Sequence, residues 1–104
     1  RKITEQRLFT MPKLTLEILA KKLNINHLHL SSIIRSHTNK AFNDYINECR
    51  IMLSKKLLAD SAYKDYTITA IGLESGFNSK STFYTAFKKN TELTPTEYQK
   101  SLVK

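Results

Sequence analysis

The sequence contains few of the residues that interrupt regular structure or crosslink a chain. Its 104 residues include only two glycines, two prolines and one cysteine. A single cysteine excludes an internal disulfide framework and is typical of a reducing compartment, so we expect a cytoplasmic protein. No apolar run approaches the ~20 residues that a membrane-spanning helix needs, and no signal peptide opens the chain.

Acidic residues are scarce as well. Seventeen lysines and arginines stand against nine aspartates and glutamates, which gives a net charge of +8. This balance indicates a nucleic acid or an anionic membrane surface as partner. The length suits one domain or two small subdomains. Because the first residue is Arg1 rather than methionine, we expect the chain to be part of a longer protein whose sensory region lies elsewhere.

Alternating β-branched residues are rare, so we predict an all-α fold of about seven helices. The expected helices are residues 3–9; 16–23, capped by Thr15; 27–38, capped by Asn26; 43–60; 68–75, capped by Thr67; 78–90, opened by Asn78; and a last one with Thr94 as cap, Pro95 at its first position and Glu97 completing a capping box. Residues 61–66 are expected to form a loop. The long helix 43–60 would join a first subdomain, residues 1–42, to a second, residues 61–104.

The chain contains the same pattern twice, at a shift of 52 residues that becomes 53 after one insertion. The matched pairs include Thr15 and Thr67, Leu19 and Ile71, Ala20 and Gly72, Asn24 and Gly76, Leu30 and Phe83, and Ile34 and Phe87. Asn24 and Gly76 both tolerate the left-handed backbone of a sharp turn, while Ala20 and Gly72 are small enough for two helices to cross closely. The pattern predicts two helix-turn-helix units.

The second helix of each unit has an inward and an outward side when residues are placed at about 100° intervals. The residues expected to point inward are Leu30, Ile33 and Ile34 in the first copy, and Phe83, Ala86 and Phe87 in the second. The outward faces are Leu28, Ser31, Ser32 and Arg35 in the first copy, and Ser81, Tyr84, Thr85 and Lys88 in the second, with Lys80 at the edge. The two faces correspond position by position.

Both outward faces lie in windows without acids, residues 24–43 and 75–91. Small side chains let a helix enter a groove, and Ser, Thr, Arg and Lys can contact bases or phosphates. We therefore predict a surface for double-stranded DNA. A helical module that docks an acidic protein surface remains an alternative, because Leu28 and Tyr84 place apolar or aromatic groups at matching outward sites.

The stretch "ITAIGLESGFNSKSTFYTAFKKNTELTPTEY" resembles the signature of the AraC/XylS-type transcription regulators, and "FNDYINECRIMLSKKLL" resembles their linker helix. The resemblance covers about residues 14 to 100. It implies a bacterial DNA-binding domain that inserts two recognition helices into adjacent major-groove segments, and it implies RNA polymerase as a further partner. "AKKLNIN" and "GFNSKSTFYTAFKK" are also similar to output domains at the end of hybrid two-component sensor regulators.

The resemblance implies roles for residues at matching positions. Those implied to read bases are Leu28, Ser31, Ser32, Arg35, Lys80, Ser81, Tyr84, Thr85 and Lys88; those implied to contact the DNA backbone are Asn26, Lys40, Asn78, Ser79 and Lys89. The chain departs from the family at Ser31, Ser32 and Thr85, where Arg or Gln is frequent. It departs again at Glu92, where glycine is usual, so we expect an altered helix end there.

Several conspicuous side chains have a structural explanation. Cys49 is expected to be a buried thiol on the apolar stripe of the long helix, and His37 a partly buried histidine bonded to backbone. Arg50 could contact phosphate, but we favour an ion pair with Glu74. We find no catalytic set, no phosphate-binding glycine loop and no metal-ligand cluster, so we expect no enzyme, no cofactor, no metal and no membrane contact by this domain.

Overall fold

The structure is a computed structural model that describes residues 8–102, and every regular element in that range is helical. The elements are η1 (Leu8–Thr10), α2 (Leu16–Leu23), α3 (His27–Thr38), α4 (Phe42–Ala59), η2 (Ser61–Tyr63), α5 (Ile68–Glu74), α6 (Lys80–Thr91) and α7 (Pro95–Ser101). The all-α prediction is confirmed. The expected helix 3–9 lies mostly outside the described residues, and residues 8–10 form a 3₁₀ turn. The expected loop 61–66 begins with a second 3₁₀ turn, η2.

Side-chain caps begin most of the helices, as the sequence predicts. Thr15 and Thr67 accept hydrogen bonds from backbone N–H groups three residues later, and Asn26 accepts from the N–H groups two and three residues later. Thr94 and Glu97 form both halves of a capping box. The bond from the Thr94 N–H lowers the pKa of the Glu97 carboxyl below its ordinary value.

One cap prediction is wrong, because α6 begins two residues later than expected. Its first helical residue is Lys80, and its N-cap is Ser79 rather than Asn78. The Ser79 hydroxyl accepts a hydrogen bond from the Thr82 N–H at 3.2 Å. Asn78 belongs to the turn before the helix.

The turn inside each helix pair, and the close packing of its two helices, agree with the prediction from the sequence. Asn24 and Gly76 both have positive φ, at 58° and 112°. A Cβ atom on Gly72 would lie 2.4 Å from the Phe83 ring, which is completely buried. Only glycine therefore lets α5 approach α6 this closely. At the matching position of the first unit, the small residue Ala20 is buried where α2 packs on α3.

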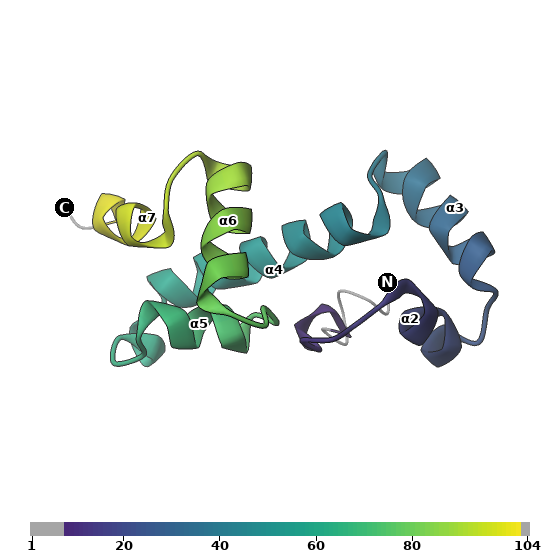
Figure 1. Cartoon of the computed structure of the whole chain (residues 1–104). Helices are drawn as coiled ribbons and strands as arrows, with labels where there is room; N and C mark the ends of the chain where they lie inside the picture. The colour runs from purple at the N-terminus through teal and green to yellow at the C-terminus, as the bar shows by residue number, and fades with distance from the viewer. Residues whose placement is uncertain (1–7, 103–104) are drawn as a thin grey trace.

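Helix α4 connects the two helix pairs and packs against both (Figure 1). It packs against η1 and α3 and also against α5 and α6, while α7 packs on the outer side of α6. The molecule is elongated, with extents of 46 × 23 × 23 Å. Cys49 is buried on α4, as expected.

Arg50 on α4 does not form the ion pair with Glu74 that the sequence suggested. Its Nε donates to the carbonyl oxygen of Phe9 at 2.6 Å, and its Nη2 donates to that of Met11 at 2.8 Å. The guanidinium carbon lies 5.7 Å from the centre of the Phe77 ring. Burial lowers the pKa of Arg50, although an arginine stays protonated in proteins. The side chain therefore fastens the segment before α2 to α4.

Two further expectations need correction. Ile33 was expected to point inward, yet it lies at the edge of the buried side and is 36% exposed. His37 is exposed rather than partly buried, although its Nδ1 does lie 3.0 Å from the carbonyl oxygen of Ile33. Both residues flank the narrow buried stripe of α3, whose centre is Leu30 and Ile34.

The end of α6 is not altered by Glu92. This residue takes the left-handed conformation with φ 66°, and its N–H bonds to the carbonyl oxygen of Lys88 at 2.8 Å. Asn39 ends α3 in the same way, with φ 59°. A left-handed backbone costs most residues about 1–2 kcal/mol but is easier for asparagine and glycine. The helix end is therefore kept at some cost in stability.

Replacing Leu30 by alanine should lower the free energy of unfolding by about 2–5 kcal/mol, because the side chain is only 3% exposed. Leu28, on the same helix but 69% exposed, is the matched control and should change it by about 0.5 kcal/mol or less when replaced by alanine. Urea denaturation measures both. Equal effects would mean that the two sides of α3 are wrongly assigned.

Replacing Glu92 by glycine should raise the free energy of unfolding by about 1 kcal/mol, because glycine adopts the left-handed conformation without strain. Asn39→Gly, at the equivalent end of α3, should gain less, since asparagine already tolerates that conformation. Thermal unfolding of the two variants gives the comparison. A gain at Asn39 as large as at Glu92 would contradict the explanation.

Candidate nucleic-acid interface

The predicted face of α3 is at the surface. Leu28, Ser32 and Arg35 are exposed, and Ser31 is half-buried. Leu30 and Ile34, on the other side of the helix, are buried. The helical periodicity thus separates a core side from a polar and basic outer side with one apolar group, Leu28.

The matching face of α6 is also at the surface, with one exception. Lys80, Ser81, Thr85 and Lys88 are exposed, whereas Tyr84 is half-buried. The Tyr84 hydroxyl lies 3.3 Å from Oγ1 of Thr96 at the start of α7, and its ring meets the edge of Phe83. The Lys80 Nζ lies 5.4 Å from the centre of the Tyr84 ring. The Tyr84 side chain is therefore directed towards α7, and the Lys80 ammonium group lies against its ring.

The two residues at the helix starts already have structural partners. Oδ1 of Asn26 accepts the Leu28 N–H at 2.8 Å, and Oγ of Ser79 accepts the Thr82 N–H. Asn78 is exposed beside Ser79. Because capping uses the oxygen atoms, the amide nitrogen of Asn26 remains the part of that side chain suited to donate to a phosphate.

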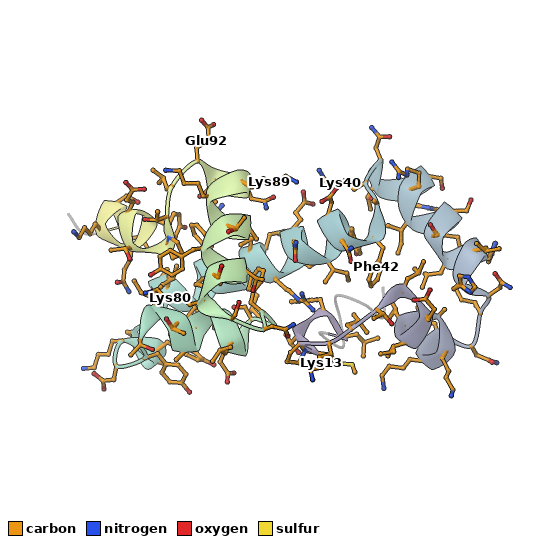
Figure 2. All side chains as sticks on the ribbon, viewed as in Figure 1. Lys13, Lys40, Phe42, Lys80, Lys89 and Glu92 are labelled. Carbon is orange, nitrogen blue, oxygen red and sulfur yellow. The ribbon has the colours of Figure 1, made fainter. Side chains whose placement is uncertain are left out.

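The two lysines expected at the DNA backbone both pair with acids of α4. Nζ of Lys89 lies 3.7 Å from Asp44, and Nζ of Lys40 lies 3.4 Å from Glu48. Figure 2 shows the two lysines on the same side of α4. The windows that lack acids in the sequence are therefore not free of acids in space. The i, i+4 spacing of Asp44 and Glu48 placed them on one face of α4, but nothing local indicated that the lysines would meet them.

These ion pairs are exposed at both ends. Their side chains are between 41% and 74% accessible, and pairs of this kind contribute about 0–1 kcal/mol. A phosphate group could replace either carboxylate at little cost. The pairs therefore hold Lys40 and Lys89 near the surface between α3 and α6 without removing them from it.

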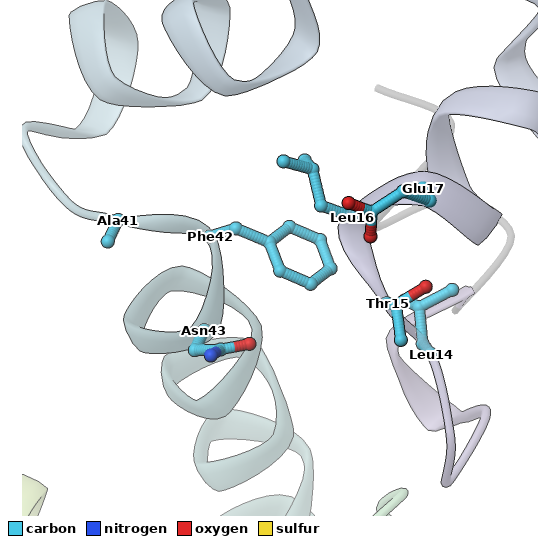
Figure 3. Close-up of a pocket in the computed structure, with 7 residues that line it drawn as sticks. All are labelled: Leu14, Thr15, Leu16, Glu17, Ala41, Phe42 and Asn43. Carbon is cyan, nitrogen blue, oxygen red and sulfur yellow. The ribbon is translucent and has the colours of Figure 1, made fainter. Parts of the chain in front are cut away.

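An open groove of about 380 Å³ lies between the starts of α2 and α4. It is lined by Leu14, Thr15, Leu16, Glu17, Ala41, Phe42 and Asn43. Figure 3 shows the Phe42 ring directed across the groove towards α2. Glu17 is the one ionisable residue in the lining, so the groove has no pair of groups suited to acid–base or nucleophilic chemistry.

Among residues 8–102, no helix has both the length and the apolar composition needed to cross a bilayer.

Comparison with known proteins gives the family. A family model described as a helix-turn-helix domain matches residues 19–101. An uncharacterized helix-turn-helix-type transcriptional regulator of Staphylococcus aureus is 34% identical over 86 residues, which cover 83% of this chain but only 11% of that protein. The chain thus spans about a tenth of the length of this curated relative.

Two solved structures share the fold. The C-terminal domain of the two-component response regulator yesN from Fusobacterium nucleatum is 31% identical, with a TM-score of 0.77 over 94% of this chain and 91% of that one. The C-terminal domain of AraT, a response regulator from Geobacillus stearothermophilus, is 27% identical, with a TM-score of 0.83 over 97% of this chain and 83% of that one.

The repeated helix pairs, the turn chemistry and the matched sequence family agree with one another. The chain therefore belongs to the AraC-type helix-turn-helix family, whose members are DNA-binding domains of transcription regulators and not enzymes.

Proposed function

We propose that this domain binds a specific sequence in double-stranded DNA by inserting α3 and α6 into adjacent major-groove segments. The observation that carries the proposal is the matched pair of outward faces, polar and basic, on two helices that both pack against α4 (Figure 1). Helix α4 has 18 residues, so it is about 27 Å long at 1.5 Å per residue. That length suits two helices that enter the groove one turn, about 34 Å, apart.

The outward residues of α3 and α6 would contact base edges, and the residues around the helix starts and the α4 side would contact phosphates. The base-contacting set is Leu28, Ser31, Ser32, Arg35, Lys80, Ser81, Tyr84, Thr85 and Lys88; the backbone set is Asn26, Lys40, Asn78, Ser79 and Lys89. Arg35 suits a guanine, and Leu28 suits a thymine methyl. Since most of the other side chains are small, groove shape and bridging water would supply part of the specificity.

The functional division of the chain follows from this arrangement. Residues 1–42 and 61–104 would each carry one recognition helix, and residues 43–60 would hold them apart. Because the chain spans only 11% of its relative, we place sensing or dimerisation in an N-terminal region outside it. Contact with RNA polymerase and a cytoplasmic location belong to the same proposal.

Arg35→Ala and Lys80→Ala should each weaken binding to the cognate site by about 1–3 kcal/mol, because each would lose a base contact. Lys64→Ala removes the same charge from the exposed turn after η2 and is the control. The site is first selected from a random duplex library, and fluorescence anisotropy then gives the affinities. Unchanged affinity in both variants would refute the assigned faces.

The alternative is a protein-interaction module that docks an acidic partner, and the 69% exposure of Leu28 favours it. A mobility shift with random duplex at several salt concentrations separates the two functions. DNA binding predicts measurable affinity whose logarithm falls linearly with the logarithm of salt concentration, with a slope of about −0.9 per phosphate contacted. The absence of duplex binding at low salt would favour the protein partner.

A further inference from the structure

A second, smaller pocket lies where η1, α4 and the start of α6 meet. Its volume is about 150 Å³, and it is lined by Pro12, Asn47, Arg50, Phe77, Asn78 and Thr82. Asn78 and Thr82 are exposed and Asn47 is half-buried, so the pocket opens at the surface. Its wall contains one cation, three neutral polar side chains and no acid.

The guanidinium of Arg50 is the unusual component of this wall. The residue is only 9% exposed, and among residues 8–102 it forms no ion pair. Two of its five N–H donors reach the carbonyl oxygens of Phe9 and Met11. Neither N–H of Nη1 has a protein acceptor in the described residues. A buried cation without an anion is costly, so this charge would gain from an anionic ligand.

The other lining groups suit the same ligand. The amides of Asn47 and Asn78 can both donate hydrogen bonds, whereas the Thr82 hydroxyl already donates to the carbonyl oxygen of Ser79 at 3.0 Å and only lines the pocket. The positive end of the α6 dipole adds a favourable potential at this place. A water molecule occupies about 30 Å³ of liquid, so the pocket has room for a group of about five non-hydrogen atoms, as in a phosphate.

The pocket lies beside the proposed DNA-reading face. Thr82 and Lys89 are seven residues apart on one flank of α6, about 10 Å along the helix axis. That flank faces α4, because Thr82 lines the pocket with Asn47 and Lys89 pairs with Asp44. Thr85, in the base-contacting set, is one turn from Thr82. A DNA strand bordering the groove that α6 enters would therefore pass along this flank.

We propose that this pocket binds one phosphodiester group of the DNA backbone, with Arg50 supplying the charge and the amides of Asn47 and Asn78 donating hydrogen bonds. The inference rests on the proposed function and adds to it a contact from α4, the helix between the two recognition helices. Arg50 then has two roles, since the same guanidinium that fastens the chain before α2 also attracts the phosphate.

The test compares Asn47→Asp with Asn43→Asp in the whole 104-residue chain. Both changes lower the net charge by one on the same exposed side of α4, one turn apart, but only Asn47 lines the pocket. Asn47→Asp should weaken binding to every duplex about tenfold more than Asn43→Asp and reduce the salt slope by about 1. Its melting temperature should not fall, because the new carboxylate lies near Arg50.

A second measurement locates the phosphate. Single neutral methylphosphonate linkages are placed in turn along the selected duplex, and the affinity of each duplex is measured with the unmodified chain and with Asn47→Asp. We expect one linkage beside the segment read by α6 to weaken binding of the unmodified chain but not of the variant. A variant that responds to every linkage as the unmodified chain does would overturn the inference.

Titration of inorganic phosphate into the free domain, followed through the side-chain amide NMR signals of Asn47 and Asn78, separates a DNA phosphate from a free anion. If phosphate shifts these signals while Asn47→Asp and Asn43→Asp bind DNA equally, the pocket holds a free anion and the DNA assignment is wrong. If the two variants are equal and phosphate has no effect, the pocket is not an anion site and the proposed function stands. If the unmodified chain binds no duplex, the proposed function itself fails.

Discussion

The burial of α4 on two sides is the constraint from which the rest of the structure follows. Its buried residues run along the whole helix, from Phe42 and Ile46 to Leu53 and Leu57, and it packs against α3 of the first pair and against α5 and α6 of the second. Because a helix of 18 residues kinks sharply only if its i→i−4 hydrogen bonds are disturbed, this one element sets the spacing and the angle between α3 and α6. Neither helix pair could move alone without exposing part of this core.

A second restraint closes the junction between the helix pairs. Arg50 bonds to the carbonyl oxygens of Phe9 and Met11, and Gly76 leaves the space that this contact needs. A Cβ atom on Gly76 would lie 2.5 Å from the Phe9 oxygen and 2.8 Å from Nε of Arg50. The same glycine has the positive φ of the turn before α6. The start of the second recognition helix is therefore coupled to the chain that precedes the first.

Part of the positive charge on the outer surface is paired with acidic side chains, which the composition does not show. The net charge is +8, yet Lys40 and Lys89 both lie against carboxylates of α4. Exposed pairs of this kind are weak. They orient the two lysines but leave their charges available to another anion. The buried charge of Arg50, in contrast, has only neutral oxygen partners among the described residues. In the proposed complex, phosphates of DNA would pair with Lys40 and Lys89 and with the guanidinium of Arg50.

The sequence by itself determined the α-helices of the described residues, the N-caps of α2, α3, α5 and α7, the left-handed turns and, apart from Ile33, the buried side of each recognition helix. These features depend on residues within about four positions of one another, where spacing alone dictates which groups meet. Only the tertiary structure decided that Arg50 binds residues 39 and 41 positions away, that Asp44 meets Lys89 and that Tyr84 turns towards α7. Such contacts depend on how rigid helices pack against one another, and the periodicity of a single helix contains no information about the position of its neighbour.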